Sequence, residues 1–229
     1  MTKAELLREQ KRQERLKAER ERLETMKEYE YRYMDRGMLC GIDEVGRGPL
    51  AGPVVAGAVI LPKDCEILYL NDSKKLTEKR RELLYDEIME KALAVSLGVV
   101  GPERIDEINI LQATYEAMRI AVAGLKVRPD LLLNDAVTIP QVEIPQVPIV
   151  KGDAKSVSIA AASVIAKVTR DRMMAEYENI YPGYGFASNK GYGAAKHIAA
   201  LKELGPCKIH RRSFIKNFVP ENSVIESCP

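Results

Sequence analysis

The sequence predicts an α/β fold in which helices cover both faces of a central mixed sheet. Five short runs rich in apolar and β-branched residues alternate with segments of helical periodicity, which is typical of sheets covered by helices. The first three strand candidates resemble a meander, whereas helices separate the last two, so we expect both antiparallel and parallel pairing. No internal repeat or low-complexity linker divides the chain.

The N-terminal segment 3–36 is predicted to be one charged helix that ends at Gly37. It contains no glycine or proline and is rich in Glu, Lys, Arg, Leu and Gln, which favour helix. Leu16, Leu23 and Met26 form too thin an apolar stripe for a coiled coil. We expect a solvated helix that docks loosely or frays, with an arm that binds a partner or nucleic acid as the alternative.

The remaining elements follow from periodicity and turn signals. We expect strands at 38–43, 54–62, 92–101, 129–135 and 147–153, and helices at 77–93, 103–124, 154–178 and 193–204. The predicted organisation is a helical extension over 1–36, one domain over 37–218 with a helical C-terminal portion, and a flexible tail over 219–229.

The composition excludes several classes of protein. Of the 229 residues, 46% are apolar and 30% charged, which is the balance of a globular protein. The sequence has neither a membrane-length apolar run nor a signal-type apolar segment, so we expect no membrane span and no secretion. The four cysteines lie far apart, which fits a cytoplasmic protein. With only two histidines, any metal would be held mainly by carboxylates, which favours Mg²⁺ or Mn²⁺.

Three of the predicted strands end in acidic residues. Asp43 and Glu44 follow the first strand, Asp135 the fourth and Asp153 the fifth. Ligands gather at strand ends in α/β sheets, and carboxylates that meet there repel one another unless a cation neutralises them. Such a cluster suits two-metal phosphoryl displacement. For each acid alone the alternative is a turn or capping role, with Asp153 as the cap of helix 154–178.

A glycine-rich turn, GRGPLAGP at 46–53, follows the first acids. It is neither a Walker A loop nor GxGxxG, because no GK[ST] follows and Pro49 intervenes. Glycines let the backbone approach a ligand and expose its N–H groups, and Arg47 could fork onto a phosphate. We therefore expect the turn to approach a sugar–phosphate chain, with a plain hairpin turn as the alternative.

The last third of the chain is basic, with twelve basic and five acidic side chains within 151–218. Cations that bind phosphates and rings that stack are interleaved there, as in proteins that follow a nucleic-acid backbone. Tyr192 lies in the glycine-flanked loop NKGYG, which can present its ring to solvent, although a core tyrosine is the alternative. The interleaved set is Lys155, Lys167, Arg170, Arg172, Tyr181, Tyr184, Lys190, Tyr192, Lys196, His197, His210, Arg211 and Arg212.

Seven stretches, in a fixed order, carry a family resemblance. They are GIDEVGRGPLAGPVVAGAVIL, NDSKKLTEKRREL, INILQATYEAM, PDLLLNDA, KGDAKSVSIAAASVIAKVTRDRMM, YPGYGFASNKGYGAAKHIAAL and GPCKIHRRSF. Over residues 39–218 the chain resembles bacterial type II ribonuclease H. The resemblance implies an RNase H-like mixed five-stranded sheet. It also implies a metal-dependent endonuclease that cleaves RNA in RNA–DNA hybrids and at single ribonucleotides embedded in duplex DNA.

The resemblance also implies the product and the catalytic residues. Cleavage would occur on the 5′ side of the ribonucleotide and leave a 5′-phosphate and a 3′-hydroxyl, so that ribonucleotides can be removed from DNA. The family's catalytic acids match Asp43, Glu44, Asp135 and Asp153, which would bind two Mn²⁺ or Mg²⁺ ions.

The substrate-binding elements of the family also match. The turn Gly46, Arg47 and Gly48 resembles the element that recognises the ribose 2′-hydroxyl. Tyr192 resembles the tyrosine that packs on the deoxyribose 3′ of the ribonucleotide. The resemblance further implies backbone contacts from Ser73, Lys74 and Lys75.

Two features distinguish the chain within this group. Type III relatives usually carry GTG at the turn and a larger N-terminal domain, so Arg47 and the short extension favour type II. Asn134 precedes Asp135 where an apolar residue is more usual, and we expect a slight tilt of that carboxylate. The alternatives are an RNase H-like nuclease that acts on DNA, a non-catalytic hybrid-binding module and a nucleotide-binding α/β protein. We expect a monomer whose partners are nucleic acid duplexes.

Overall fold

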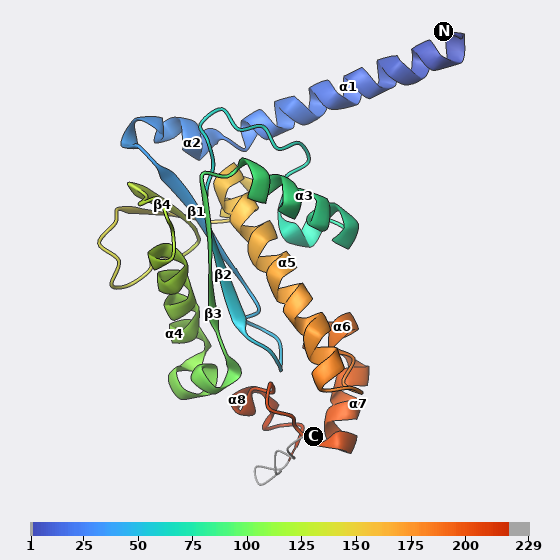
Figure 1. Cartoon of the computed structure of the whole chain (residues 1–229), viewed down its shortest axis with the longest axis vertical. Coiled ribbons are helices and arrows are strands. Elements are labelled where there is room, and N and C mark those ends of the chain that lie inside the picture. The colour runs from blue at the N-terminus through green and yellow to red at the C-terminus, as the bar shows by residue number, and fades with distance from the viewer. Residues whose placement is uncertain (1, 220–229) are drawn as a thin grey trace.

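The computed structural model describes residues 2–219 and has a mixed five-stranded sheet at its centre (Figure 1). The strands are β1 (Leu39–Val45), β2 (Val54–Ile60), β3 (Ala94–Val100), β4 (Leu131–Asp135) and β5 (Gln146–Ile149). Their order is β3-β2-β1-β4-β5. The pairs β1–β2 and β2–β3 are antiparallel, and β1–β4 and β4–β5 are parallel. The predicted meander and mixed sheet are both confirmed.

Helices cover both faces of the sheet (Figure 1). The helix α4 (Pro102–Ala123) packs on one face, and α5 (Val157–Ile180) packs on the other together with α3 (Glu78–Lys91). The shorter helices α6 (Phe186–Asn189), α7 (Ala195–Leu204) and α8 (Arg212–Ile215) form the C-terminal portion. Short 3-10 turns lie at η2 (Ser73–Lys75) and η3 (Gly152–Ala154). No helix among the described residues combines the length and apolar character needed to cross a membrane.

The alanine-rich sequence of α5 is explained by its close approach to the sheet. A Cβ added at Gly41 would lie 2.0 Å from the backbone carbon of Ser158, so the helix and β1 meet backbone to backbone. Ala160, Ala161 and Ala162 are fully buried in the same interface. Small side chains therefore fix the depth of α5 and, with it, the position of the residues that precede the helix.

Two predicted helices differ from the observed ones in an instructive way. The helix predicted at 103–124 is bent at Asn109, whose φ is +66°. The Asn109 side chain accepts hydrogen bonds from Leu111 N and Gln112 N, and so it caps the second part of α4. The helix predicted from 154 begins at Val157, and its cap is Ser156, which accepts from Ile159 N. Asp153 is therefore not the cap of this helix.

The prediction of one helix over 3–36 is wrong. The structure has α1 (Lys3–Thr25), α2 (Glu28–Arg32) and the 3-10 turn η1 (Met34–Arg36). Leu23 and Met26 are buried in the core beside α3 and α5, so the chain must turn there to follow the protein surface. The outer part of α1 extends away from the body (Figure 1). The tail predicted at 219–229 lies outside the described residues except for Val219.

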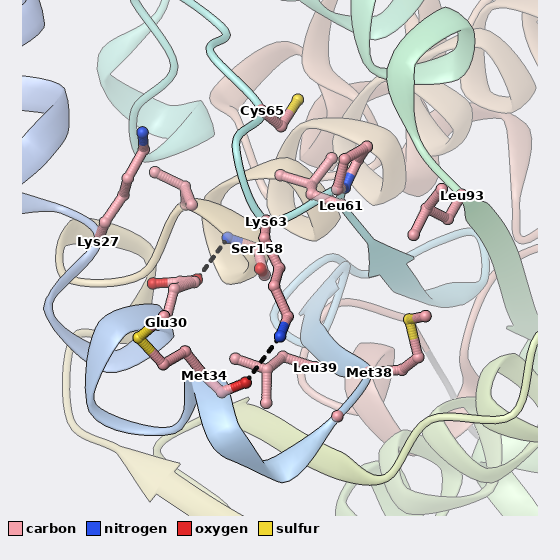
Figure 2. A pocket seen from close by; sticks show the side chains of 13 residues that line it. Lys27, Glu30, Met34, Met38, Leu39, Leu61, Lys63, Cys65, Leu93 and Ser158 are labelled. Atoms are coloured by element: carbon pink, nitrogen blue, oxygen red, sulfur yellow. Dashed lines mark hydrogen bonds between the residues drawn. The ribbon is translucent and has the colours of Figure 1, made fainter.

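The segment after α1 attaches to the first turn of α5. Glu30 accepts hydrogen bonds from the Ser156 hydroxyl at 2.5 Å and from Ser158 N at 3.0 Å. Figure 2 shows this carboxylate beside a cavity of about 280 Å³ between the N-terminal segment and the sheet. A carboxylate at a helix N-terminus stabilises the helix. Glu30 thus ties the N-terminal segment to the helix that follows Asp153.

Glu30→Ala is expected to lower the free energy of unfolding by about 1–2 kcal/mol, because it removes an N-terminal capping interaction of α5. Chemical denaturation measures the change. Glu28→Ala, at an exposed position of α2, the helix that also carries Glu30, is the control and should lower the free energy of unfolding by no more than about 0.5 kcal/mol. Equal losses in the two variants would contradict the capping role.

Candidate active site

The acids predicted from strand ends lie together at one edge of the sheet. Asp43 belongs to β1 and Asp135 ends β4, the neighbouring parallel strand. Asp135 accepts a hydrogen bond from Gly152 N at 2.7 Å, which holds the turn with Asp153 against the end of β4. The topology therefore brings carboxylates from three distant parts of the chain to one place.

Asp43 is the most enclosed of these acids, with only 7% of its surface exposed. Burial raises its pKa well above the usual range, and the charges of Glu44 and Asp135 raise it further. Its Oδ1 accepts from Glu44 N at 2.8 Å, and Ser163 of α5 also donates to the carboxylate. Ser163 is held in turn by the Ser73 hydroxyl, 2.8 Å away. Hydrogen bonds thus fix the position of the Asp43 carboxylate, and its surroundings disfavour its negative charge.

The other acids share this environment. Burial raises the pKa of Glu44, and Asp135 adds to the rise although Arg47 lies 3.4 Å away. Burial, Asp72 and Asp135 together raise the pKa of Asp153. Asp72 was missed in the sequence, where the only signal was its place in NDSKKL next to the predicted contact residues. Like charges that raise one another's pKa mark a site that favours a cation.

Lys74 is a positive charge that interacts with several acids of this cluster. Burial lowers its pKa, but the charges of Asp43, Asp72, Asp153 and Asp135 outweigh burial and raise it. The site thus holds oxygen donors only, which suits a hard ion such as Mg²⁺ or Mn²⁺. Within residues 2–219 no three Asp, Glu, His or Cys side chains are arranged as a ready-made ion site.

The turn at 46–53 is held from beneath by two buried arginines, which we call the arginine clamp: Arg170 and Arg211. Both are 0% exposed. Arg170 donates from Nε to the Pro53 carbonyl at 2.9 Å. Arg211 donates to the carbonyl oxygens of Gly46, Arg47 and Gly52.

The clamp fixes which side of the turn faces solvent. Burial, followed by the charge of Arg170, lowers the pKa of Arg211 to about 9, so the guanidinium is still charged at neutral pH. Gly46 has φ +93°, and a Cβ there would lie 2.3 Å from the Arg170 Nε, so a larger residue is excluded. With its carbonyls directed at the clamp, the turn leaves the Arg47 side chain exposed beside Glu44.

The loop that carries Tyr192 lies against the same turn. Leu50 N donates to Gly191 O at 2.8 Å, and a Cβ at Gly48 would lie 3.9 Å from the Tyr192 ring. Tyr192 is 45% exposed. The structure therefore places the predicted turn and the predicted tyrosine side by side, although about 140 residues of sequence separate them.

Several members of the interleaved basic and aromatic set do not face solvent. The two arginines of the clamp, the two histidines and Tyr184 are buried, so the prediction that they follow a nucleic-acid backbone is wrong: Arg170, Arg211, His197, His210 and Tyr184. Sequence composition cannot separate a basic side chain that binds backbone carbonyls inside the protein from one that binds phosphate at the surface.

The two histidines form a buried chain of hydrogen bonds behind Tyr192. His210 Nδ1 accepts from Cys207 N at 3.0 Å, and the two Nε2 atoms are 3.0 Å apart. His197 Nδ1 lies 2.8 Å from Tyr192 O. These partners place the protons on His210 Nε2 and His197 Nδ1, so both rings are neutral. Burial, followed by the repulsion that a protonated His197 would exert, lowers the pKa of His210 to about 3.

The histidine pair is expected to make folding stability depend on pH. A folded-state pKa of about 3 for His210, below the usual 6.5, means that its contribution is fully present above pH 6.5 and is lost as the pH falls towards 3. The free energy of unfolding of the wild type relative to His210→Gln should therefore fall by about 1–2 kcal/mol between pH 7.5 and pH 5. Denaturant titrations at both pH values measure this difference, and a difference independent of pH would contradict the assignment.

The three residues of η2 that were predicted to contact the nucleic-acid backbone, Ser73, Lys74 and Lys75, differ in their exposure. Ser73 is buried and its hydroxyl is engaged with Ser163, so it supports Asp43 from behind. Lys74 and Lys75 are exposed.

Asn134 donates to Gln146 at 2.8 Å in the core, and alternation along β4 directs it to the face opposite Asp135.

The model of the family described as ribonuclease HII matches residues 40–217. The chain belongs to the ribonuclease HII family. Ribonuclease HII of Lachnoclostridium phytofermentans is 70% identical over 212 residues, which cover 93% of this chain and 84% of that one. Ribonuclease HII of Bacillus subtilis is 55% identical over 206 residues, which cover 89% and 80%. The chain is thus a type II ribonuclease H, an endonuclease and hydrolase.

Solved structures of ribonuclease HII relatives have the same fold. The ribonuclease H2 of Pyrococcus horikoshii superposes with a TM-score of 0.65 at 29% identity, over 77% of this chain and 93% of that one. The RNase HII of Archaeoglobus fulgidus, solved as a complex with PCNA, gives 0.64 at 27% identity over 82% and 98%. The predicted α/β fold with a mixed five-stranded sheet is confirmed.

Proposed function

We propose that the protein cleaves RNA in RNA–DNA hybrids and also at single ribonucleotides embedded in duplex DNA. Cleavage would fall on the 5′ side of the ribonucleotide and leave a 5′-phosphate and a 3′-hydroxyl. The observation that carries the proposal is the meeting of Asp43, Glu44, Asp135 and Asp153 beside the glycine turn and Tyr192.

The four acids would hold two divalent ions, Mn²⁺ or Mg²⁺. Such ions, when bound, activate a water and stabilise the leaving oxygen of an in-line displacement. Asp43 would contact both ions, Glu44 and Asp135 would complete the set, and Asp153 would hold the second ion or assist proton transfer. Support comes from the raised pKa of Asp43, since burial beside like charges favours the entry of positive charge.

The substrate would be recognised by the turn and the neighbouring ring. A ribose 2′-hydroxyl both donates and accepts hydrogen bonds, so the backbone of Gly46, Arg47 and Gly48 can read it directly. Tyr192 would pack on the adjacent deoxyribose, where a 2′-hydroxyl would obstruct it. The exposed Lys74 and Lys75 would contact the phosphate backbone. The proposal includes action as a monomer in the cytoplasm.

Cleavage-site mapping tests the proposal. The substrates are an RNA–DNA hybrid, a DNA duplex with one ribonucleotide and the matching duplex of DNA alone, each with Mn²⁺, Mg²⁺ or excess chelator. We expect cuts in the hybrid and one cut 5′ of the embedded ribonucleotide with either metal, and none with chelator or in DNA alone. Cleavage of the all-DNA duplex, or cleavage that persists in chelator, would reject it.

A further inference from the structure

The projecting helix α1 carries a basic stripe on one face. Arg8, Lys11, Arg12 and Arg15 recur at spacings of three and four residues, which places them on the same side of a helix. All four are exposed. Arg12 lies 3.5 Å from Glu9, whereas in the described part of the chain no acidic side chain forms a salt bridge with the other three.

The stripe is continuous with the lysines near the acid cluster. Arg8, Arg12 and Arg15 line one surface hollow together with Tyr69. Tyr69 also lines a second hollow, which includes the basic residues Lys75 and Arg80. The Arg80 guanidinium lies over the Tyr69 ring, 4.5 Å from its centre. The two hollows share Tyr69, so basic side chains line the surface from η2, next to the acids, to α1, with Glu19 as an acidic residue among them.

The inner end of α1 is fixed to the body, so the stripe has a defined direction. Arg22 donates to the Leu70 carbonyl at 2.7 Å, and Glu19 accepts from Tyr69 N at 2.7 Å. Arg20 pairs with Glu66 at 3.1 Å. The helix has 23 residues, and at a rise of about 1.5 Å per residue it spans about 35 Å, close to one turn of duplex DNA, of which the stripe from Arg8 to Arg15 covers about 11 Å.

We propose that the basic stripe of α1 binds the phosphate backbone of a duplex that continues beyond the cleavage site. This inference rests on the proposed function, because it takes the duplex at the acids as its starting point. Cations at spacings of three and four residues suit contact with a phosphate backbone, and three of the four, Arg8, Lys11 and Arg15, have no salt bridge within residues 2–219. The stripe lengthens the binding site without reading sequence or sugar type.

The test compares two double variants that each remove two positive charges from α1. Lys11→Gln/Arg15→Gln alters the stripe, and Lys3→Gln/Lys17→Gln alters the opposite side of the same helix as the matched control. Glutamine keeps the helix propensity close to that of lysine and arginine. Binding in chelator is measured on duplexes of about 12 and about 40 base pairs, each with one central ribonucleotide, over a range of salt concentrations.

We expect the stripe variant to bind the long duplex at least about threefold more weakly, with the slope of log K against log salt reduced by about 1–2. The control variant should match the wild type on both duplexes, and the stripe variant should match it on the short one. Equal affinity and equal salt slope for the stripe and control variants on the long duplex would overturn the inference. That result is also the one expected if the stripe binds an acidic protein instead of a duplex. Normal cleavage of the short duplex by the stripe variant, measured separately with Mn²⁺, would leave the proposed function intact.

Discussion

Asp43→Asn is expected to abolish cleavage while leaving the protein folded. Asp43 is the acid at the centre of the cluster, and asparagine keeps its shape but loses the negative charge that would attract the ions. Residues that only support metal ligands cost about 10–100-fold when replaced, so loss of a ligand should reduce turnover by more than about 10²-fold. Single-turnover cleavage of a duplex with one ribonucleotide measures the effect.

The same substitution should not destabilise the protein in the absence of metal. Burial and neighbouring charges raise the pKa of Asp43, so its ionised form weakens the fold at neutral pH and the neutral amide removes that cost. The free energy of unfolding in chelator should equal or exceed that of the wild type. Asp86→Asn, at an exposed position of α3, should change neither turnover nor stability. Wild-type turnover in Asp43→Asn with either metal would disprove its role.

Arg211→Lys is expected to be the most damaging conservative substitution outside the acids. The Arg211 guanidinium donates to the carbonyls of Gly46, Arg47 and Gly52 from a fully buried position. Lysine cannot reproduce a planar fork of donors. Unpaired carbonyls and a buried ammonium should lower the free energy of unfolding by about 2–4 kcal/mol.

A loosened turn should also impair recognition of the ribonucleotide. At a temperature where Arg211→Lys remains folded, we expect the rate of cleavage at a single embedded ribonucleotide to fall by about tenfold or more, because misplaced contacts reduce turnover strongly. Arg212→Lys, the exposed neighbour, is the matched control and should behave as the wild type. If the two lysine variants were equally stable and equally active, the clamp would have no role in shaping the turn.

The sheet and the main helices could be predicted from the sequence, because each has a periodic pattern of its own. The break after Thr25 could not, since helix propensity continues unbroken to Arg36 and only the docking of Leu23 and Met26 on the core forces the turn. The bend at Asn109 likewise depends on a local side-chain cap within an otherwise helical pattern.

The convergence of Asp43, Glu44 and Asp135 could be predicted because strand ends in an α/β sheet converge, whereas Asp153, predicted at the end of a strand, lies in the turn η3 after β5 has ended at Ile149. The residues that support these acids could not be predicted from the sequence. Ser163 reaches Asp43 only because α5 packs directly on glycine in β1, and Asp72 joins the cluster through the placement of η2. The buried Arg170 and Arg211 resemble phosphate-binding residues in sequence, and their role depends on carbonyls more than a hundred residues away.

Calorimetric titration of Mn²⁺ tests most directly whether these carboxylates form a metal centre. The wild type and the single variants Asp43→Asn, Asp135→Asn and Asp153→Asn would be titrated with a bound duplex whose scissile phosphate resists hydrolysis. We predict two ions per wild-type complex and the loss of at least one in each variant. Two ions bound with unchanged affinity in all three variants would contradict the account.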